Sequence, residues 1–349
     1  MNISFSLQPL VLALAAGLVT HGVVRAQDSD ESNKSGYFLR LGGSARFNVQ
    51  ASITGTRPTL GPGIYDDGFI LPDVGGIAAG KTWNWSYDST LQIQGNQLWH
   101  NRLDNVPTIG HRDINLSNPA LGAEFIGGYH FHEFKLWKKP ARFAIELGYG
   151  FSEFSQAMNF KAAGAAMRTT ARQNLGILPP VAPYVGTAEG PGPLINLNPG
   201  TSLVSDPAGG TTTSFQGTLE NGFHEFRFGP SLELDLTKRF SVALGAGYSS
   251  IYTAAAFKYV ETVSFNNPAI NNPSIPAIAP SRGNVTKGAW HPGLYAELLL
   301  NYRITDHIGV FLGGDFHYNN QFTFGNAAYQ VKLDLGTTYG AKAGLNVGF

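Results

Sequence analysis

The chain has 349 residues, of which 43% are hydrophobic and only 14% are charged, with 43 glycines and no cysteine. A soluble domain carries about 25% charged residues and a disordered chain has fewer aromatics than the 12% found here, so neither class fits. The 24 basic residues balance 24 acidic ones, which leaves no basic excess for binding nucleic acid. Without cysteine the chain has no disulfide, thiolate metal site or cysteine nucleophile.

The chain begins with a segment typical of exported proteins. Residues 9–24 form an apolar stretch, and Arg25, Ala26 and a polar tail follow it. This order predicts a signal peptide over residues 1–26, cleaved near Ala26, and a short periplasmic segment over residues 27–35. A helical membrane anchor is the alternative for the same stretch. No later apolar run reaches the roughly 18 residues of a membrane helix, so the sequence does not predict a helical membrane protein.

Residues 36–349 are predicted to form a single all-β domain. Apolar residues alternate with small or polar ones, as with Tyr37, Leu39 and Leu41 on one parity and Arg40 on the other. Such a period of two is typical of strands with one apolar face. In chain order the runs lie near 37–50, 123–133, 142–153, 225–236, 240–248, 294–304, 308–318 and 339–349. A soluble sandwich, which remains the alternative, would carry more Lys and Glu on its polar parity.

The connections between these runs alternate in length. Three short ones lie at 137–140, 237–239 and 305–307, and four long ones lie near 52–118, 156–222, 253–287 and 319–336. Short periplasmic turns and long extracellular loops are typical of transmembrane antiparallel up-and-down β-barrels. We therefore predict such a barrel over residues 36–349, with eight strands. Because the loops are long, a ten- or twelve-stranded barrel remains open.

Aromatic residues are placed near both ends of the predicted strands, as expected at the two surfaces of a membrane. Near the short turns these residues are Tyr37, Phe143, Phe240, Tyr302 and Phe349. Toward the long loops they are Tyr149, Tyr248, Phe316, Tyr318 and Tyr339. Two aromatic girdles are therefore predicted.

The final run ends on an aromatic residue, with Tyr339, Leu345, Val347 and Phe349 on one parity. Together with the export segment and the strands, this run resembles the bacterial outer-membrane β-barrel proteins, and it is most similar to the small eight-stranded OmpA, OmpX and OmpW types. The resemblance implies that the barrel-assembly machinery reads these four residues. It also implies the outer membrane of a Gram-negative-type bacterium, with lipid and lipopolysaccharide as partners, and it leaves an extracellular ligand open.

Charged residues on the inward parity are the candidate functional residues. Side chains fill the interior of an eight-stranded barrel, and an unpaired charge there would cost several kcal/mol, so we expect ion pairs that plug the lumen. The candidates are Arg40, Arg46, Glu124, Arg142, Glu146, Arg227, Glu233, Asp235, Glu297, Arg303, Asp315 and Lys342, with Glu225 on the same parity. In a wider barrel some of these charges would line a solute path instead.

Two groups of side chains are considered as a possible metal site and a possible catalytic site. His130 and His132, beside Glu133, could begin a metal site, but a third ligand is not identifiable and neutral or paired histidines are expected. Asp315 and His317 could form an acid–base pair with Ser249 or Ser250, but no nucleophile motif supports a hydrolase. We therefore assign no catalytic residue, metal ligand or cofactor.

Three aromatic residues in the first long loop, Trp83, Trp85 and Tyr87, share one parity. They predict a hairpin that extends the barrel wall, and a carbohydrate-binding platform is the alternative. The sequence as a whole predicts a non-enzymatic integral outer-membrane protein with a structural or surface-interaction role through its extracellular loops. A small-solute channel and a lipid-modifying enzyme are the alternatives, and no nucleic-acid partner is expected.

Overall fold

The computed structural model describes residues 36–57, 59–74, 80–114, 116, 118–270 and 280–349. The predicted signal peptide, its cleavage site near Ala26 and the predicted segment 27–35 lie outside the described residues. Within these ranges the chain is almost wholly strand, with one 3-10 turn at Thr90–Gln92, which confirms the all-β prediction. No helix in the described part is long and apolar enough to cross a membrane.

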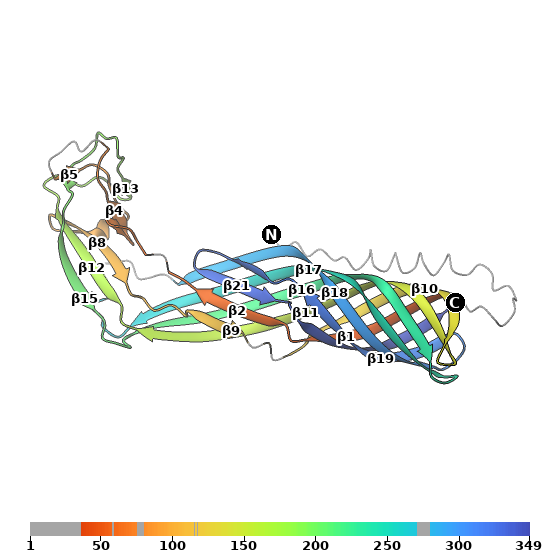
Figure 1. The fold of residues 1–349 in the computed structure, drawn as a ribbon. Coiled ribbons are helices and arrows are strands. Elements are labelled where there is room, and N and C mark those ends of the chain that lie inside the picture. The colour runs from red at the N-terminus through yellow and green to blue at the C-terminus, as the bar shows by residue number, and fades with distance from the viewer. Residues whose placement is uncertain (1–35, 58, 75–79, 115, 117, 271–279) are drawn as a thin grey trace.

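Eight strands pair into a closed antiparallel barrel in which β1 pairs with both β10 and β22. In ring order they are β1 (Gly36–Phe47), β10 (Ala120–Leu136), β11 (Lys139–Gly164), β16 (Thr211–Asp235), β17 (Phe240–Phe265), β18 (Ser281–Arg303), β19 (Ile308–Asn319) and β22 (Thr338–Gly348). Each strand neighbours the next one of the ring, so the barrel wall has the predicted up-and-down order (Figure 1).

Tight turns close one end of the barrel. Between β10 and β11, Trp137 and Lys138 have φ angles of 48° and 65°, as a two-residue type I′ hairpin turn requires. In the other two turns the amides of Leu236 and Ile304 each donate to the carbonyl four residues later, at 2.9 Å. The C-terminus lies at this end, where the Phe349 amide donates to the Tyr37 carbonyl at 2.8 Å (Figure 1).

Four strands continue far beyond the predicted barrel. The loops predicted near 156–222 and 253–287 are wrong in extent, because β11 runs to Gly164, β16 starts at Thr211, β17 runs to Phe265 and β18 starts at Ser281. The ladder between β11 and β16 is unbroken from Ala141 to Gly164. Opposite these extensions lies a second sheet, in the order β20-β21-β2-β9.

The second sheet completes a β-sandwich above the barrel. Its strands are β2 (Gln50–Gly55), β9 (His111–Ile114), β20 (Phe322–Gly325) and β21 (Tyr329–Asp334), so the loop predicted near 319–336 is instead a hairpin. Between the sheets lies an apolar core that includes Ile53, Met158, Phe215, Leu219, Phe223, Ile251, Phe257, Tyr259, Tyr329, Val331 and Leu333. We call this unit the sandwich.

A third unit, the head, lies at the far end from the tight turns (Figure 1). The predicted loop 52–118 is wrong here too, because it contributes strands to three small sheets, ordered β15-β12-β8-β7, β13-β6-β4-β3 and β14-β5. Their bounds are β3 (Ile64–Tyr65), β4 (Gly68–Ile70), β5 (Lys81–Thr82), β6 (Trp85–Tyr87), β7 (Ile93–Gln94), β8 (Gln97–Asp104), β12 (Met167–Asn174), β13 (Tyr184–Val185), β14 (Ile195–Asn196) and β15 (Gly200–Ser205). The head core contains Ile70, Trp85, Tyr87, Leu98, Leu175 and Ile195.

Candidate functional site

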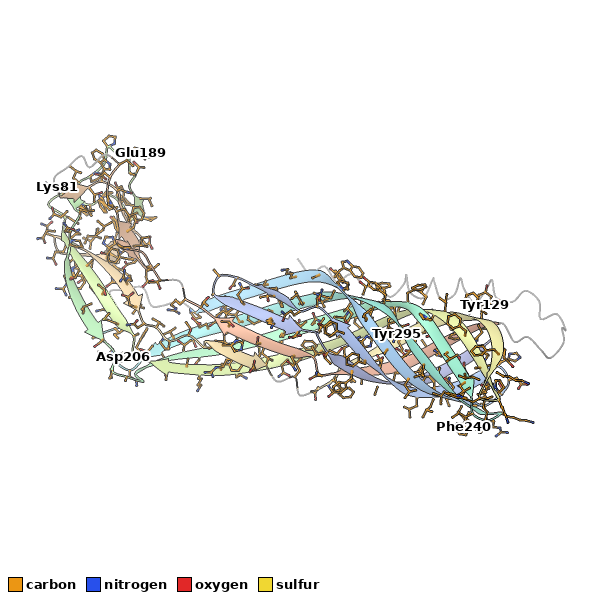
Figure 2. The ribbon with its side chains drawn as sticks, in the orientation of Figure 1. Lys81, Tyr129, Glu189, Asp206, Phe240 and Tyr295 are labelled. Atoms are coloured by element: carbon orange, nitrogen blue, oxygen red, sulfur yellow. The ribbon has the colours of Figure 1, made fainter. Side chains whose placement is uncertain are left out.

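The outer wall of the barrel is apolar and exposed. Large aliphatic and aromatic side chains on all eight strands point away from the lumen, among them Leu41, Leu121, Leu147, Phe228, Leu244, Leu298, Leu312 and Leu345, each at least half exposed. Exposed aromatics lie toward the turns, such as Tyr37, Phe143 and Phe240, and toward the sandwich, such as Tyr248, Tyr318 and Tyr339. Figure 2 places Phe240 at the turn end. Such a band, flanked by aromatic residues, is what a lipid-embedded barrel presents.

The lumen next to the turns holds one cluster of charges beside a cavity of about 420 Å³, which Arg142, Glu233 and Arg303 help to line. Arg142 donates to Glu233 at 3.0 Å and to Asp235 at 2.8 Å, and Arg303 pairs with the same two carboxylates. Ser241 donates to Glu233 at 2.5 Å. These side chains come from β11, β16, β17 and β18, so the cluster ties neighbouring wall strands together across the lumen.

A second cluster lies farther into the barrel and is more deeply buried. Lys342 lies 2.8 Å from Glu297, 2.9 Å from Asp315 and 3.3 Å from Glu124. Arg227 donates to Glu124 at 2.6 Å. The Lys342 side chain has no exposed area, and the carboxylates it contacts are at most 9% exposed.

Arg40 joins this second cluster from β1. It donates to Glu146 at 2.9 Å and lies 3.9 Å from Glu297. With this pair, all twelve lumen candidates except Arg46 belong to one of the two clusters. Arg46 pairs with Glu225 nearer the sandwich.

The group around Glu225 also contains the histidine considered for acid–base chemistry. His317 lies between two carboxylates, with Nδ1 2.8 Å from Glu225 and Nε2 3.1 Å from Asp315. Ser249 donates to Glu225 at 2.7 Å, not to His317, and Ser250 lies on the opposite, outward parity of β17. The predicted alternative of a serine–histidine pair is therefore not assembled here.

Little space is left at this level of the lumen. The cavity beside Arg46, Glu124, Glu225 and Asp315 measures about 20 Å³, which is room for about one water. Above it, Phe223 and Ile251 are 1% and 0% exposed and begin the sandwich core. Ion pairs followed by aromatic packing therefore close the lumen at this level.

The faces of the long strands exchange character where the barrel meets the sandwich. On β11 the outward residues change from Phe143, Ile145, Leu147, Tyr149 and Phe151 to Glu153, Ser155, Ala157, Asn159 and Lys161. On β16 the inward residues change from Glu233, Arg227 and Glu225 to Phe223, Leu219 and Phe215. The two switches lie at one level, because Ser152 is the register partner of Phe223. This level marks the upper edge of the apolar band.

Of the two histidines considered for a metal site, His130 is placed among the ion pairs of the lumen. The pairing of β10 with β11 shifts register between His130 and His132, so the two do not follow regular strand alternation. His130 Nε2 lies 3.4 Å from Glu233 and joins the ion-pair cluster at the turn end. Among the described residues no group of three or more His, Asp or Glu side chains could hold a metal ion.

The head buries two of the three aromatic residues that predicted a wall hairpin or a sugar platform, while the third, Trp83, is half-buried and donates through Nε1 to the Ala188 carbonyl at 3.3 Å. Trp85 and Tyr87 are 0% and 1% exposed, and their strand β6 pairs with β4 and β13 within the head. The wall-hairpin prediction is therefore wrong. Trp85 and Tyr87 have no free ring face for a ligand, because they form the head core instead.

A buried polar set lies beside that core. Asp67 accepts from the Asn101 amide at 2.7 Å and from Asn101 Nδ2 at 2.8 Å. Burial nevertheless raises the pKa of Asp67 to about 6. His100, next along β8, lies 2.7 Å from the Ser86 carbonyl through Nε2, and burial lowers its pKa to about 4. Nothing here faces an open cavity, so these groups are structural.

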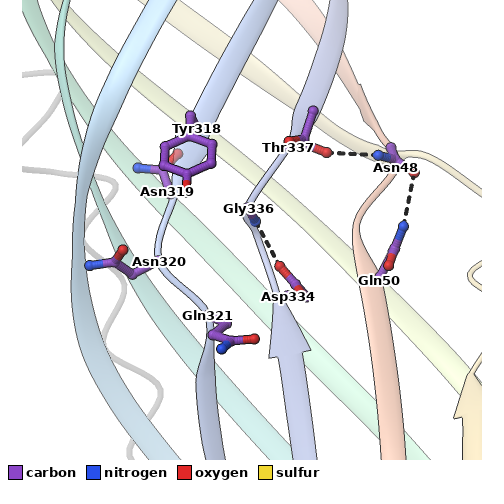
Figure 3. A pocket seen from close by; sticks show the side chains of 9 residues that line it. All are labelled: Asn48, Gln50, Tyr318, Asn319, Asn320, Gln321, Asp334, Gly336 and Thr337. Atoms are coloured by element: carbon purple, nitrogen blue, oxygen red, sulfur yellow. Dashed lines mark hydrogen bonds between the residues drawn. The ribbon is translucent and has the colours of Figure 1, made fainter.

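One polar feature was missed at the level of the sequence: a notch in the wall where the β19–β22 ladder stops. The last pair of that ladder is His317 with Thr338, and pairing resumes only at Phe322 with Leu333. All four residues on one side of the gap and three of the four on the other contribute to a cavity of about 450 Å³ (Figure 3). Its lining is Asn48, Gln50, Tyr318, Asn319, Asn320, Gln321, Asp334, Gly336 and Thr337. The signal in the sequence was the run Asn319-Asn320-Gln321 in the middle of an alternating region.

The four residues of the predicted assembly signal lie at the end of the barrel wall. Tyr339 and Leu345 are 52% exposed, and they share their parity on β22 with Val347. Phe349 follows the last strand residue and is 57% exposed. These positions present an apolar edge to the surroundings, and recognition by an assembly machinery remains a prediction.

No protein-family model and no curated protein matches this chain. Among solved structures it is similar to Ail, the attachment invasion locus protein of Yersinia pestis in complex with the heparin analogue sucrose octasulfate, with 5% identity and a TM-score of 0.26 over 89% of this chain and 99% of that one. It is also similar to the outer membrane protease OmpT of Escherichia coli, with 10% identity and a TM-score of 0.31 over 93% and 99%. A FadL homologue of Pseudomonas aeruginosa gives 9% identity and a TM-score of 0.20 over 89% and 90%. At these TM-scores function must be inferred from this chain's own side chains.

Proposed function

We propose that this chain is a non-enzymatic integral outer-membrane protein whose plugged barrel anchors the sandwich and the head outside the cell for a surface interaction. The observation that carries the proposal is the exchange of faces along the long strands. Below Ser152 and Phe223 the wall is apolar and the inside is ionic, which suits lipid. Above that level the outside is polar and the inside apolar, which suits water.

The packing supports an anchor more than a channel. The cavity of about 20 Å³ beside Arg46 and the aromatic core above it leave no room for a hydrated solute at that level. An enzymatic role lacks support as well, since Ser249 donates to a carboxylate and His317 is 1% exposed. The candidate residues of the lumen therefore act through stability in this proposal, and the interacting surface belongs to the units above the membrane.

Orientation is tested with single cysteines, because the chain contains none of its own. Lys81→Cys lies in the head and Lys138→Cys lies in a tight turn, and both positions are exposed. A maleimide that does not cross membranes should label Lys81→Cys in intact cells. It should label Lys138→Cys only after the outer membrane is permeabilised. Labelling in the reverse order would overturn the proposed orientation.

Conduction is tested by recording single-channel current from the refolded full chain in planar lipid bilayers. Folding is checked first by protease resistance of the inserted protein. The expected result is no stepwise current at any salt concentration. A stable ohmic conductance from the inserted chain would replace the anchor with a small-solute channel.

A further inference from the structure

We infer that the notch between β19 and β22 is a carbohydrate-binding site at the outer surface of the membrane. The inference goes beyond anchoring, and only its membrane-surface location rests on the proposed function. Its starting point is geometric. The ladder between β19 and the chain before β22 is interrupted for four residues on each side, with one backbone bond, from the Asn319 amide to the Leu335 carbonyl at 3.2 Å, across the gap, and most of the lining side chains are carboxamides.

The lining consists mainly of carboxamides. Asn48, Gln50, Asn319, Asn320 and Gln321 each offer an acceptor oxygen and a donor NH₂ group. A sugar hydroxyl also donates and accepts, so a set of amides complements a polyol in a way that a set of like charges does not. Asp334 adds one carboxylate, which can accept from two neighbouring hydroxyls.

The charge of the notch argues against anionic ligands. No Lys, Arg or His lines it, and Asp334 is its one charged group. A phosphate or sulfate would meet the negative charge of Asp334, whose partner Lys332, at 3.9 Å, is not part of the lining. Its volume of about 450 Å³ lies within the range of roughly 300–1,000 Å³ for small-molecule sites and far exceeds the size of a bare metal ion.

Part of the hydrogen-bonding capacity of the notch is unused. Asn319 is 2% exposed and its Nδ2 donates to the His291 carbonyl at 3.2 Å, but its Oδ1 has no partner among the described residues. A buried acceptor without a partner costs roughly 1–3 kcal/mol. That oxygen has less than 1 Å² of accessible surface, so a ligand hydroxyl would reach it only after the Asn319 side chain turns.

Two exposed amide side chains of the notch also have unused hydrogen-bonding groups. Asn320 and Gln321 make no side-chain hydrogen bond to another described residue, whereas Asn48 is fixed by its bond to the Thr337 carbonyl at 2.7 Å (Figure 3). The notch thus combines a fixed rim at Asn48 with two adjustable amides opposite.

The position of the notch fits a sugar at a membrane surface. Tyr318 lines it and is 58% exposed on the outer wall, in the aromatic girdle next to the sandwich. Aromatic rings at that depth lie among lipid headgroups. A tyrosine beside amides offers a sugar an apolar face and hydrogen bonds together. The sugar could belong to a glycolipid of the membrane or be free in solution, and the test separates these sources.

The test uses the full chain in phosphatidylcholine nanodiscs with two probes. The first is a mixture of the methyl glycosides of glucose, galactose and mannose, detected by saturation-transfer NMR. The second is digalactosyldiacylglycerol added to the nanodisc, with the glycolipid retained by the released protein counted by native mass spectrometry. The notch variant is Asn320→Ala with Gln321→Ala. The matched control is Asn159→Ala with Gln216→Ala, an exposed amide pair facing each other across β11 and β16.

We expect the notch variant to lose at least fivefold in saturation transfer or in retained glycolipid, and the control to match the wild type. Loss with the free glycosides assigns a soluble sugar, and loss with the glycolipid alone assigns a lipid headgroup. If neither probe distinguishes the notch variant from the control, the inference is overturned. Insertion is measured first, so a chain that fails to insert contradicts the proposed function, and one that inserts without binding contradicts the notch alone.

Discussion

A charged side chain buried in the lumen contributes far more to the free energy of unfolding than a charged side chain on the surface does. Lys342 is fully buried among Glu124, Glu297 and Asp315, so Lys342→Met leaves buried carboxylates without their cation. Breaking such a set typically costs about 3–5 kcal/mol. Lys258→Met is the control, because Lys258 pairs with Glu220 at 3.6 Å while both are about half exposed, and such pairs contribute ~0–1 kcal/mol. Urea unfolding of the refolded chain measures both, and equal losses would contradict the ion-pair plug.

The head carries two buried groups whose pH dependences oppose each other. The raised pKa of Asp67 means that the unfolded head ionises first, so stability falls as pH rises from about 4 to about 6. The lowered pKa of His100 means that the unfolded head protonates first, so stability falls as pH drops from about 6.5 to about 4. Burial also raises the pKa of Asp66, which acts in the same direction as Asp67. The opposing slopes offset one another in the wild type.

Single substitutions should separate these slopes. Asp67→Asn leaves the His100 contribution, opposed only by that of Asp66, so head stability should rise by up to about 3 kcal/mol between pH 4 and 6.5. His100→Gln leaves the carboxylate slope, so stability should fall by about 3 kcal/mol as pH rises from 4 to 6. Hydrogen exchange of the β8 and β12 amides reports on the head, with β22 amides as the internal control. If both variants show the same dependence of head stability on pH as the wild type, this account is wrong.

At the scale of elements, one strand passes through two environments without a break. Leu147 and Ala157 both point outward from β11, on either side of the switch near Ser152. Leu147→Arg should therefore cost about 2–4 kcal/mol on folding into phospholipid vesicles, as for a charge facing the bilayer midplane. Ala157→Arg should change stability by less than about 0.5 kcal/mol, as at an ordinary surface position. Similar costs for both would place the membrane edge elsewhere.

Much of the barrel was predictable because its alternation is regular below the switch. Phe143, Ile145 and Leu147 follow the period-two pattern, and the parity of Arg142 and Glu146 was therefore predicted correctly. Above Ser152 the apolar residues lie on the other face of the same strand. A prediction that follows the apolar residues of one face therefore ends the strand too early. Trp85 and Tyr87 alternate like residues of the barrel wall. The two strands that flank them in the head, β4 and β13, are separated from each other by more than 100 residues of sequence. Long-range pairings of this kind, including which carboxylate each lumen cation meets, are set by strand register.

At the scale of the whole molecule, two cores of opposite chemistry are stacked along one barrel. Phe215 is 1% exposed at the centre of the sandwich core, with its ring 4.9 Å from that of Tyr329. Phe215→Ala should destabilise the sandwich by about 3–5 kcal/mol. Exchange should accelerate at the Phe257 and Val331 amides and stay unchanged at the Leu345 amide of β22. Uniform acceleration would mean that the two cores unfold together.

The uninterrupted strands β11, β16 and β17 also set the mechanics of the molecule. At about 3.3 Å per residue, a strand such as β11, with 26 residues, spans roughly 85 Å from the tight turns to the head. A pull on the head along these strands would load their ladder bonds in shear, many at once, and would not peel them one after another. A head carried on such continuous strands would resist displacement by flow better than a head tethered by the flexible loops that the sequence predicted.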